Sequence, residues 1–444
     1  MALTGTDIVH ILLPVVQITS LALPPFQHRA LIFVPLIAAL AYASATNLGA
    51  YSAELRATLI SLWPWYLGTI ADLAWARPEH DYWRLDRPAH EAESMSGGWG
   101  WRKLAWSAAL WANPRGIGWS HQIRGVRRGR GPAARWPFVW YQLRRYVAYY
   151  LIVDVMGMYT MRHFYHTDVD LGTITVRAAS WTRSFYNSWH LLLQVIAQLQ
   201  FQYISCSMVT VALGIYEPKD WPPWLGTWQD LRSVRLLWNA WEHQIIRRVF
   251  SAYARVVVTF LGLRRGTNLD HYSRVYVSFF ISGIFHGVTN VVMPGSPSET
   301  FGLQFVFYIL QAFAIQAEDL VAWIYQQLPR TDKNRKEHKA VPGVGDQQKE
   351  TQDTAAVPSF VSESSSRVRF TWQRAVGHLW VILWVWFSMG WAGDGLLRSG
   401  IARLTPIPVS VAEILLARAE HTAWFRATLM PWVYAYIGST PQQK

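Results

Sequence analysis

The sequence is poor in cysteine and in charge. Its single cysteine, Cys206, cannot form an internal disulfide, and it argues against a thiol nucleophile or a cysteine-based metal site. Only 16% of the 444 residues are charged, whereas soluble domains average roughly 25%. The low charge indicates that much of the surface does not face water.

Short motifs that mark common catalytic sites are also absent. The sequence has no GxSxG nucleophile elbow, Walker loop, GxGxxG fingerprint or HExxH zinc motif. His163 and His166 precede Asp168 and Asp170 at a spacing that permits metal binding. A hydrated loop is the simpler explanation of that group. We therefore predict neither a metal site nor a bound cofactor.

Apolar residues are abundant instead, at 51% of the chain, together with 26 Trp and 20 Tyr. Trp and Tyr favour the membrane interface. Runs of roughly 20 apolar residues are long enough to cross a bilayer as helices. We therefore expect an all-α, multi-pass transmembrane helical bundle with about eight to ten spans. The candidate spans are residues 8–23, 30–50, 57–74, 146–161, 189–216, 249–263, 275–293, 301–325 and 379–397, with weaker candidates at 409–416 and 424–437.

The net charge of +13 lies mainly in the segments between these runs. Residues 102–145 contain many arginines and no acidic residue. The positive-inside rule places this loop in the cytosol. The clustering favours contact with lipid and argues against nucleic acid as a partner. Residues 329–371 are polar and predict a flexible loop. No internal repeat is evident, so residues 1–444 are expected to form one membrane domain.

A polar stripe interrupts the apolar run 275–293. Ser278, Ser282, His286 and Asn290 recur every four residues, which places them on one face of a helix. Ionisable groups inside a membrane are costly and usually face a cavity. We therefore predict His286 as a general base, with Ser282 and Asn290 as substrate-binding residues. A histidine that only hydrogen-bonds between helices is the alternative.

The glycines of the same run leave two interpretations open. Gly283 and Gly287 flank His286 on the helix. They could allow close helix packing or make room for a substrate.

A second segment, residues 229–249, has apolar residues at helical spacing and predicts an amphipathic helix. Asn239 and His243 lie on its polar face. His243 could bind substrate, orient His286 or stabilise an oxyanion. A solvated polar face is the alternative for each of these residues.

These segments resemble the wax synthase-like group of membrane-bound O-acyltransferases, particularly its fungal members. Residues 278–286, SFFISGIFH, are similar to the family segment that ends in its presumed catalytic histidine. Residues 233–244, SVRLLWNAWEHQ, are similar to a block in which Trp238, His243 and Gln244 match. Many members have Gly-Arg at Asn239-Ala240 and Trp at Glu242. Further similar landmarks are PRGIGW (114–119), DWPPWLGTW (220–228), QAED (316–319) and residues 372–380.

The resemblance implies an enzyme that transfers an acyl group from a coenzyme A (CoA) thioester to an alcohol in a membrane chamber. His286 would deprotonate the alcohol, and no acyl-enzyme would form. Trp238, Asn239 and Gln244 would contact substrate. The implied partners are the lipid bilayer, acetyl-CoA or another acyl-CoA as co-substrate, and a lipophilic alcohol, such as a terpenoid or polyketide product. The expected location is the endoplasmic reticulum membrane.

Phosphates of such a donor need cationic contacts, and arginine is a usual partner. The loop 102–145 and the pairs Arg247–Arg248 and Arg264–Arg265 are candidates, with lipid contact as the alternative.

Three other functions stay open. A wax ester synthase would use a long-chain alcohol and a fatty acyl donor. A transporter or scaffold would share the composition, although paired halves are not evident. A membrane terpene cyclase needs carboxylates in its spans, and the obvious ones are Asp154 and Asp394.

Overall fold

The computed structural model describes residues 5–49, 51–91, 97–127, 129, 131–165, 169–178, 180–239, 246–327 and 372–422. These residues form helices and turns without a β-strand, which confirms the all-α prediction. The helices are α1 (Gly5–Ala22), α2 (Arg29–Thr46), α3 (Ala53–Ile60), α4 (Trp63–Trp75), α5 (Pro78–Asp81), α7 (Trp101–Trp111), α8 (Arg135–Phe164), α9 (Trp181–Ala212), α10 (Val234–Leu237), α11 (Arg247–Phe260), α12 (Asn268–Val291), α13 (Glu299–Gln327), α14 (Trp372–Arg398) and α15 (Val411–Glu420).

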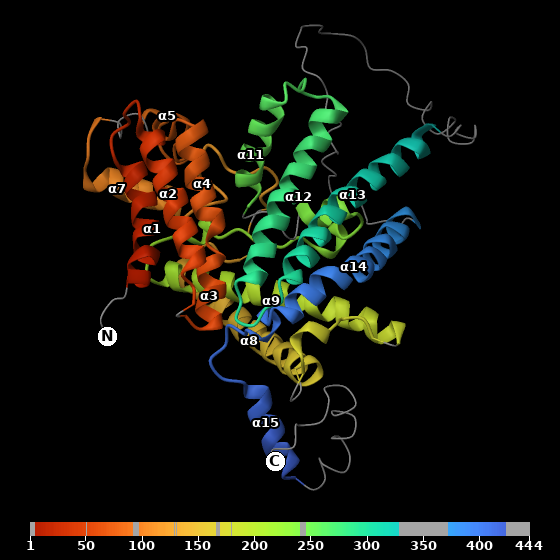
Figure 1. Cartoon of the computed structure of the whole chain (residues 1–444). Coiled ribbons are helices and arrows are strands. Elements are labelled where there is room, and N and C mark those ends of the chain that lie inside the picture. Colours follow the sequence, from red (N-terminus) through yellow and green to blue (C-terminus); the bar gives the residue numbers. More distant parts are fainter. Residues whose placement is uncertain are drawn as a thin grey trace, which may run out of the picture.

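The helices pack in two groups. Helices α1, α2 and α4 form one group, and α11 to α14 pack in chain order as the other, with α8 and α9 paired below them (Figure 1). Contacts between α4 and α11 join the groups, and α14 also packs on α9. Helix α12 is therefore enclosed between α11 and α13.

Four of the described helices are long and apolar enough to cross a membrane. They are α2, α9, α13 and the Arg374–Arg398 part of α14, and each coincides with a predicted span. Helix α1 is apolar but shorter. Helix α12, which carries the polar stripe, is not among the four. The weak candidate 424–437 lies outside the described residues.

The predicted span 57–74 is two helices rather than one. Helix α3 ends at Ile60 and α4 begins at Trp63. Pro64 lies in the first turn of α4, where its missing N–H leaves no hydrogen bond unmade. The proline therefore starts a new helix instead of interrupting a single span.

The prediction of one helix from 229 was wrong at its start, because α10 begins only at Val234. The Ser233 hydroxyl accepts a hydrogen bond from the Leu236 N–H at 3.1 Å. The Glu318 carboxylate, on α13, accepts from the backbone N–H groups of Val234 and Arg235 at 2.5 and 3.2 Å. These groups satisfy the free donors of the first turn and fix where the helix starts.

The basic segment 102–145 is partly helical, since it includes most of α7 and the first turns of α8. Arg115, in the segment that connects these helices, is buried and donates to the carbonyls of Pro222 and Pro223 at 3.1 and 3.2 Å. This contact brings the motifs 114–119 and 220–228 together. The polar segment 329–371 lies outside the described residues.

Candidate active site

Helix α12 presents its polar stripe on one face, as the spacing predicts. Ser282 and Asn290 are almost fully buried, with 0% and 1% of their surface exposed. Asn290 points toward α14, because a Cβ added at Gly395 would lie 3.0 Å from its Nδ2. His286 lies one helical turn from each of them and is partly exposed.

The stripe has unused hydrogen-bonding capacity. Neither the Ser282 hydroxyl oxygen nor Asn290 Nδ2 has a partner, although both atoms are buried. No hydrogen bond joins the His286 ring to another described residue. Buried polar atoms are nearly always paired, so a group of unpaired ones is a feature of sites that bind a ligand or water.

Aromatic rings hold His286 in place. Its ring stacks on Tyr308 of α13, with centroids 4.6 Å apart and planes at 19°. The Trp63 ring, at the start of α4, meets the imidazole in a T-shaped arrangement, with centroids 6.1 Å apart and planes at 79°. Trp63 in turn stacks on Phe285 and Phe250 at 4.7 and 5.9 Å. The imidazole is thus oriented by packing while its nitrogens stay available.

Trp238 belongs to the same aromatic wall. Its ring is buried and lies 5.7 Å from Tyr308. Its indole N–H donates to Oε1 of Gln311 at 3.2 Å, and the Trp384 indole donates to the same oxygen at 2.9 Å. The structure therefore brings Trp238 close to His286 through Tyr308.

Asn239, unlike the buried stripe residues Ser282 and Asn290, lies at the surface. It is exposed and lines a cavity of about 200 Å³ together with Ser278 and Trp238. His243 and Gln244, the two other predicted site residues of this segment, lie outside the described residues.

The two glycines beside His286 serve close packing. A Cβ at Gly287 would lie 2.7 Å from the Phe301 ring, and a Cβ at Gly283 would lie 3.0 Å from Phe305. Both phenylalanines belong to α13. The glycines thus let α13 approach α12, which leaves no space for substrate on that face.

Sequence reasoning did not identify Tyr308, Trp63 or Glu318 as parts of this region. Trp63 is far from His286 in sequence, and no local pattern pairs them. Glu318 lies in the motif 316–319; its carboxylate also accepts from the Trp380 indole at 2.7 Å. The motif 316–319 and residues 372–380, both similar to family motifs, were the sequence signal that could have indicated Glu318.

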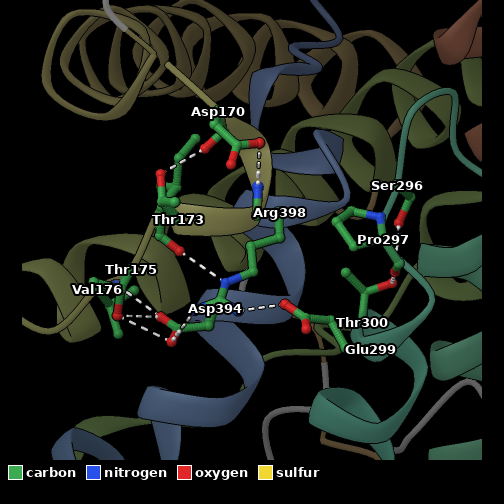
Figure 2. Close-up of polar contacts among 12 residues, drawn as sticks. Asp170, Thr173, Thr175, Val176, Ser296, Pro297, Glu299, Thr300, Asp394 and Arg398 are labelled. Atoms are coloured by element: carbon green, nitrogen blue, oxygen red, sulfur yellow. Dashed lines mark hydrogen bonds and ion pairs between the residues drawn. The ribbon is translucent and has the colours of Figure 1, made fainter.

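Asp394 is engaged in structural contacts. It accepts hydrogen bonds from the Thr175 hydroxyl at 2.9 Å and the Val176 N–H at 2.8 Å (Figure 2). Arg398 lies 3.6 Å from it and also pairs with Glu299. Both carboxylate oxygens are engaged by these partners, which gives Asp394 a structural role and argues against a cyclase acid at this position.

Asp154, the second candidate acid, is likewise occupied. Its oxygens accept from the Ser410 hydroxyl at 2.5 Å and the Ala412 N–H at 2.8 Å. It therefore caps the first turn of α15. In the group His163, His166, Asp168 and Asp170, for which a metal site was not predicted, His166 and Asp168 lie outside the described residues.

Comparison with known proteins shows the family of the chain. Residues 221–310 match the membrane bound O-acyl transferase family. The matched region runs from the segment before α10 into α13 and includes Trp238, the stripe of α12 and Tyr308. The chain belongs to the membrane-bound O-acyltransferase family. It is therefore an acyltransferase and a membrane protein. Residues 134–212, which contain α8 and α9, also match the C-terminal domain of aspirochlorine biosynthesis protein F.

Relatives of this acyltransferase occur in fungi. An acetyltransferase of Rhodocybe pseudopiperita is 26% identical over 68% of this chain and 69% of its own length. An acetyltransferase of Hericium erinaceus is 26% identical over 71% of this chain and 72% of its own. Aspirochlorine biosynthesis protein F of Aspergillus oryzae is 30% identical over 48% of this chain and 87% of its own. No solved structure matches.

Proposed function

We propose that this acyltransferase transfers an acetyl group from acetyl-CoA to a hydroxyl group of a lipophilic secondary metabolite, with a terpenoid alcohol as the leading acceptor class. The observation that carries the proposal is His286, oriented by Tyr308 and Trp63 beside two buried polar groups without partners. The names of the fungal relatives support the acetyl donor.

His286 acts as the general base in this proposal. One ring nitrogen accepts the proton of the acceptor hydroxyl while the oxygen attacks the thioester carbonyl carbon. The tetrahedral intermediate then collapses, the carbon–sulfur bond breaks, and the CoA thiolate takes the proton from the imidazolium. The products are an ester and free CoA, and no acyl-enzyme forms.

The neighbours of His286 have separate tasks. The Asn290 amide N–H has no partner and can donate to the developing oxyanion. The Ser282 hydroxyl orients the acceptor. The aromatic rings of Tyr308 and Trp63 exclude water, which protects the thioester from hydrolysis.

The segment before α11 contributes substrate contacts. Trp238 and Asn239 contact the donor near the cavity that they line. His243 orients the substrate or donates to the oxyanion. Gln244 contacts the substrate. The enzyme acts in the endoplasmic reticulum membrane, with segment 102–145 in the cytosol where acetyl-CoA is available.

Two alternatives differ in what they transfer. A wax ester synthase would prefer a long-chain acyl-CoA and a fatty alcohol. A transporter or scaffold would transfer nothing.

Microsomes that contain the protein, supplied with radiolabelled acetyl-CoA and a panel of terpenoid and fatty alcohols, test the three functions. We expect label in the terpenoid fraction with acetyl-CoA and little with palmitoyl-CoA. Preference for palmitoyl-CoA and a fatty alcohol would favour the wax synthase. Absence of label with every donor and acceptor, compared with microsomes lacking the protein, would contradict an enzymatic role.

A further inference from the structure

A cavity of about 580 Å³ lies between the C-terminal half of α4, the face of α11 and residues 121–124. Four arginines line it: Arg124, Arg247, Arg248 and Arg255. Arg247 and Arg255 are two turns apart on α11, which places their Cα atoms about 12 Å apart along the helix. The cavity therefore has positive charge on two of its walls, α11 and residues 121–124.

Only one of these arginines is neutralised by a carboxylate of the described residues. Arg248 binds both oxygens of Asp72, at 2.6 and 3.0 Å. Within the described part of the chain, Arg247 donates only to the backbone carbonyl of Arg124, at 3.3 Å. Asp81, the other acid in the lining, accepts from the Arg77 N–H and lies against His80. Arg124, Arg247 and Arg255 thus leave an excess of positive charge.

Unpaired buried atoms also face this region. Both ring nitrogens of His121 are buried without a partner, as is Nε of Arg248. His121 packs on the Tyr82 ring with centroids 4.2 Å apart. Burial, reinforced by Arg248, lowers the pKa of His121 to about 3. The ring is therefore neutral near pH 7, and it offers one donor and one acceptor to a ligand.

The charged cavity adjoins the candidate active site. Arg247 also lines the smaller cavity that holds Trp238, Asn239 and Ser278. Phe250, one turn further along α11, lines that smaller cavity and stacks on Trp63, which contacts His286. A ligand whose anionic end lies against the arginines can thus extend past Arg247 toward the catalytic histidine.

We propose that this cavity binds the phosphorylated adenosine end of CoA, with Arg124, Arg247 and Arg255 as phosphate ligands, and that the thioester arm reaches His286 through the smaller cavity. The proposal rests on the function proposed above. CoA is a long molecule with phosphates at one end and an uncharged arm at the other. The phosphates match the arginine-lined cavity, and the arm matches the smaller cavity beside it.

The structure separates the candidate arginines that sequence alone left together. Arg248 is held by Asp72 and has a structural role. Helix α11 ends at Phe260, which is roughly 20 Å along the helix from Arg247, and Arg264 and Arg265 lie beyond that end and do not line the cavity. These two residues are therefore outside the phosphate site.

Equilibrium binding of radiolabelled CoA to the purified protein in phosphatidylcholine nanodiscs tests the assignment. We expect Arg247→Gln and Arg255→Gln each to weaken CoA binding about tenfold or more, because each removes a charge-assisted contact. Adenosine 3′,5′-bisphosphate, which has phosphates but no thioester arm, should compete with CoA for the wild-type site. Arg265→Gln is the matched control and should bind CoA normally.

A second experiment measures the kinetics of acyl transfer. With S-acetylpantetheine, a donor without phosphates, the Arg247→Gln and Arg255→Gln enzymes should show wild-type KM, while their KM for acetyl-CoA rises about tenfold. CoA binding that is unchanged in both variants would overturn the site, and this is the result expected if the arginines hold an anionic lipid headgroup. CoA binding that depends on these arginines without any acyl transfer would refute the proposed function and leave the site intact.

Discussion

The His286 and Tyr308 rings lie nearly parallel, at 19° with centroids 4.6 Å apart. Stacking fixes the plane of the imidazole without using either nitrogen. A base can thus be oriented while both nitrogens remain available to a substrate. In the candidate site, ring stacking fixes the orientation of the imidazole, whereas in many catalytic histidines a hydrogen bond to a carboxylate fixes it.

Tyr308→Ala should reduce turnover, because the imidazole would lose the ring that orients it. We expect a loss of about 10²-fold, the scale of a misplaced catalytic group. Tyr308→Phe keeps the stacked ring and is the control, with activity close to wild type. Measured kcat for both variants at saturating acetyl-CoA checks this. Equal activity of the Ala and wild-type enzymes would show that stacking does not position the base.

His286→Gln should nearly abolish acyl transfer, since an amide cannot accept the proton. Losing a general base costs about 10²–10⁴ in rate. His286→Ala should behave similarly, and both proteins should insert and express as the wild type does. Initial rates with radiolabelled acetyl-CoA in microsomes measure the effect. Wild-type turnover of His286→Gln at saturating donor and acceptor would refute the general-base mechanism.

Gly287→Ala should destabilise the protein by about 1–3 kcal/mol, because its Cβ would meet the Phe301 ring, which lies only 2.7 Å away. Gly302→Ala is the matched control on the facing helix, since nothing lies within 4 Å of its Cβ position. Thermal unfolding in detergent compares the two. A Gly287→Ala protein as stable as Gly302→Ala would show that α12 and α13 are not closely packed there.

Stability should fall in mild acid through His121. Its pKa is about 3 in the folded protein and about 6.5 when unfolded. Between these values the unfolded state binds the extra proton, so the free energy of unfolding decreases as pH falls. Lowering the pH from 7 to 5 should cost about 2 kcal/mol through this group.

The comparison of wild type with His121→Gln isolates that contribution from other histidines. The variant should lose less thermal stability between pH 7 and 5 than the wild type. Unfolding curves of the two proteins that shift in parallel with pH would contradict a neutral, buried His121.

The orientation in the membrane is a further prediction. A glycosylation acceptor inserted next to Gly125 should stay unmodified, because the positive-inside rule places segment 102–145 in the cytosol. Segment 329–371 should be cut by protease, since its composition cannot form a core. Gel shifts after expression in microsomes report both. Efficient glycosylation at Gly125 would reverse the proposed topology.

Local regularity made part of this protein predictable. Apolar run length and helical period are properties of short stretches of chain, so the sequence alone indicated the membrane class, the helices and the stripe that contains His286 and Asn290. The start of α10 was not predictable in that way. It depends on the Glu318 carboxylate, which the fold brings from α13 to the N–H groups of Val234 and Arg235.

The partners of the stripe were decided by tertiary structure. The Trp63 ring reaches His286 only because α4 packs beside α11, and no spacing rule links residues so far apart in sequence. Arg247 and Arg248 are neighbours with the same chemistry, yet only Arg248 meets Asp72. Adjacent residues on a helix point about 100° apart, so the surrounding helices, rather than the residue type, determine which arginine is neutralised and which remains available.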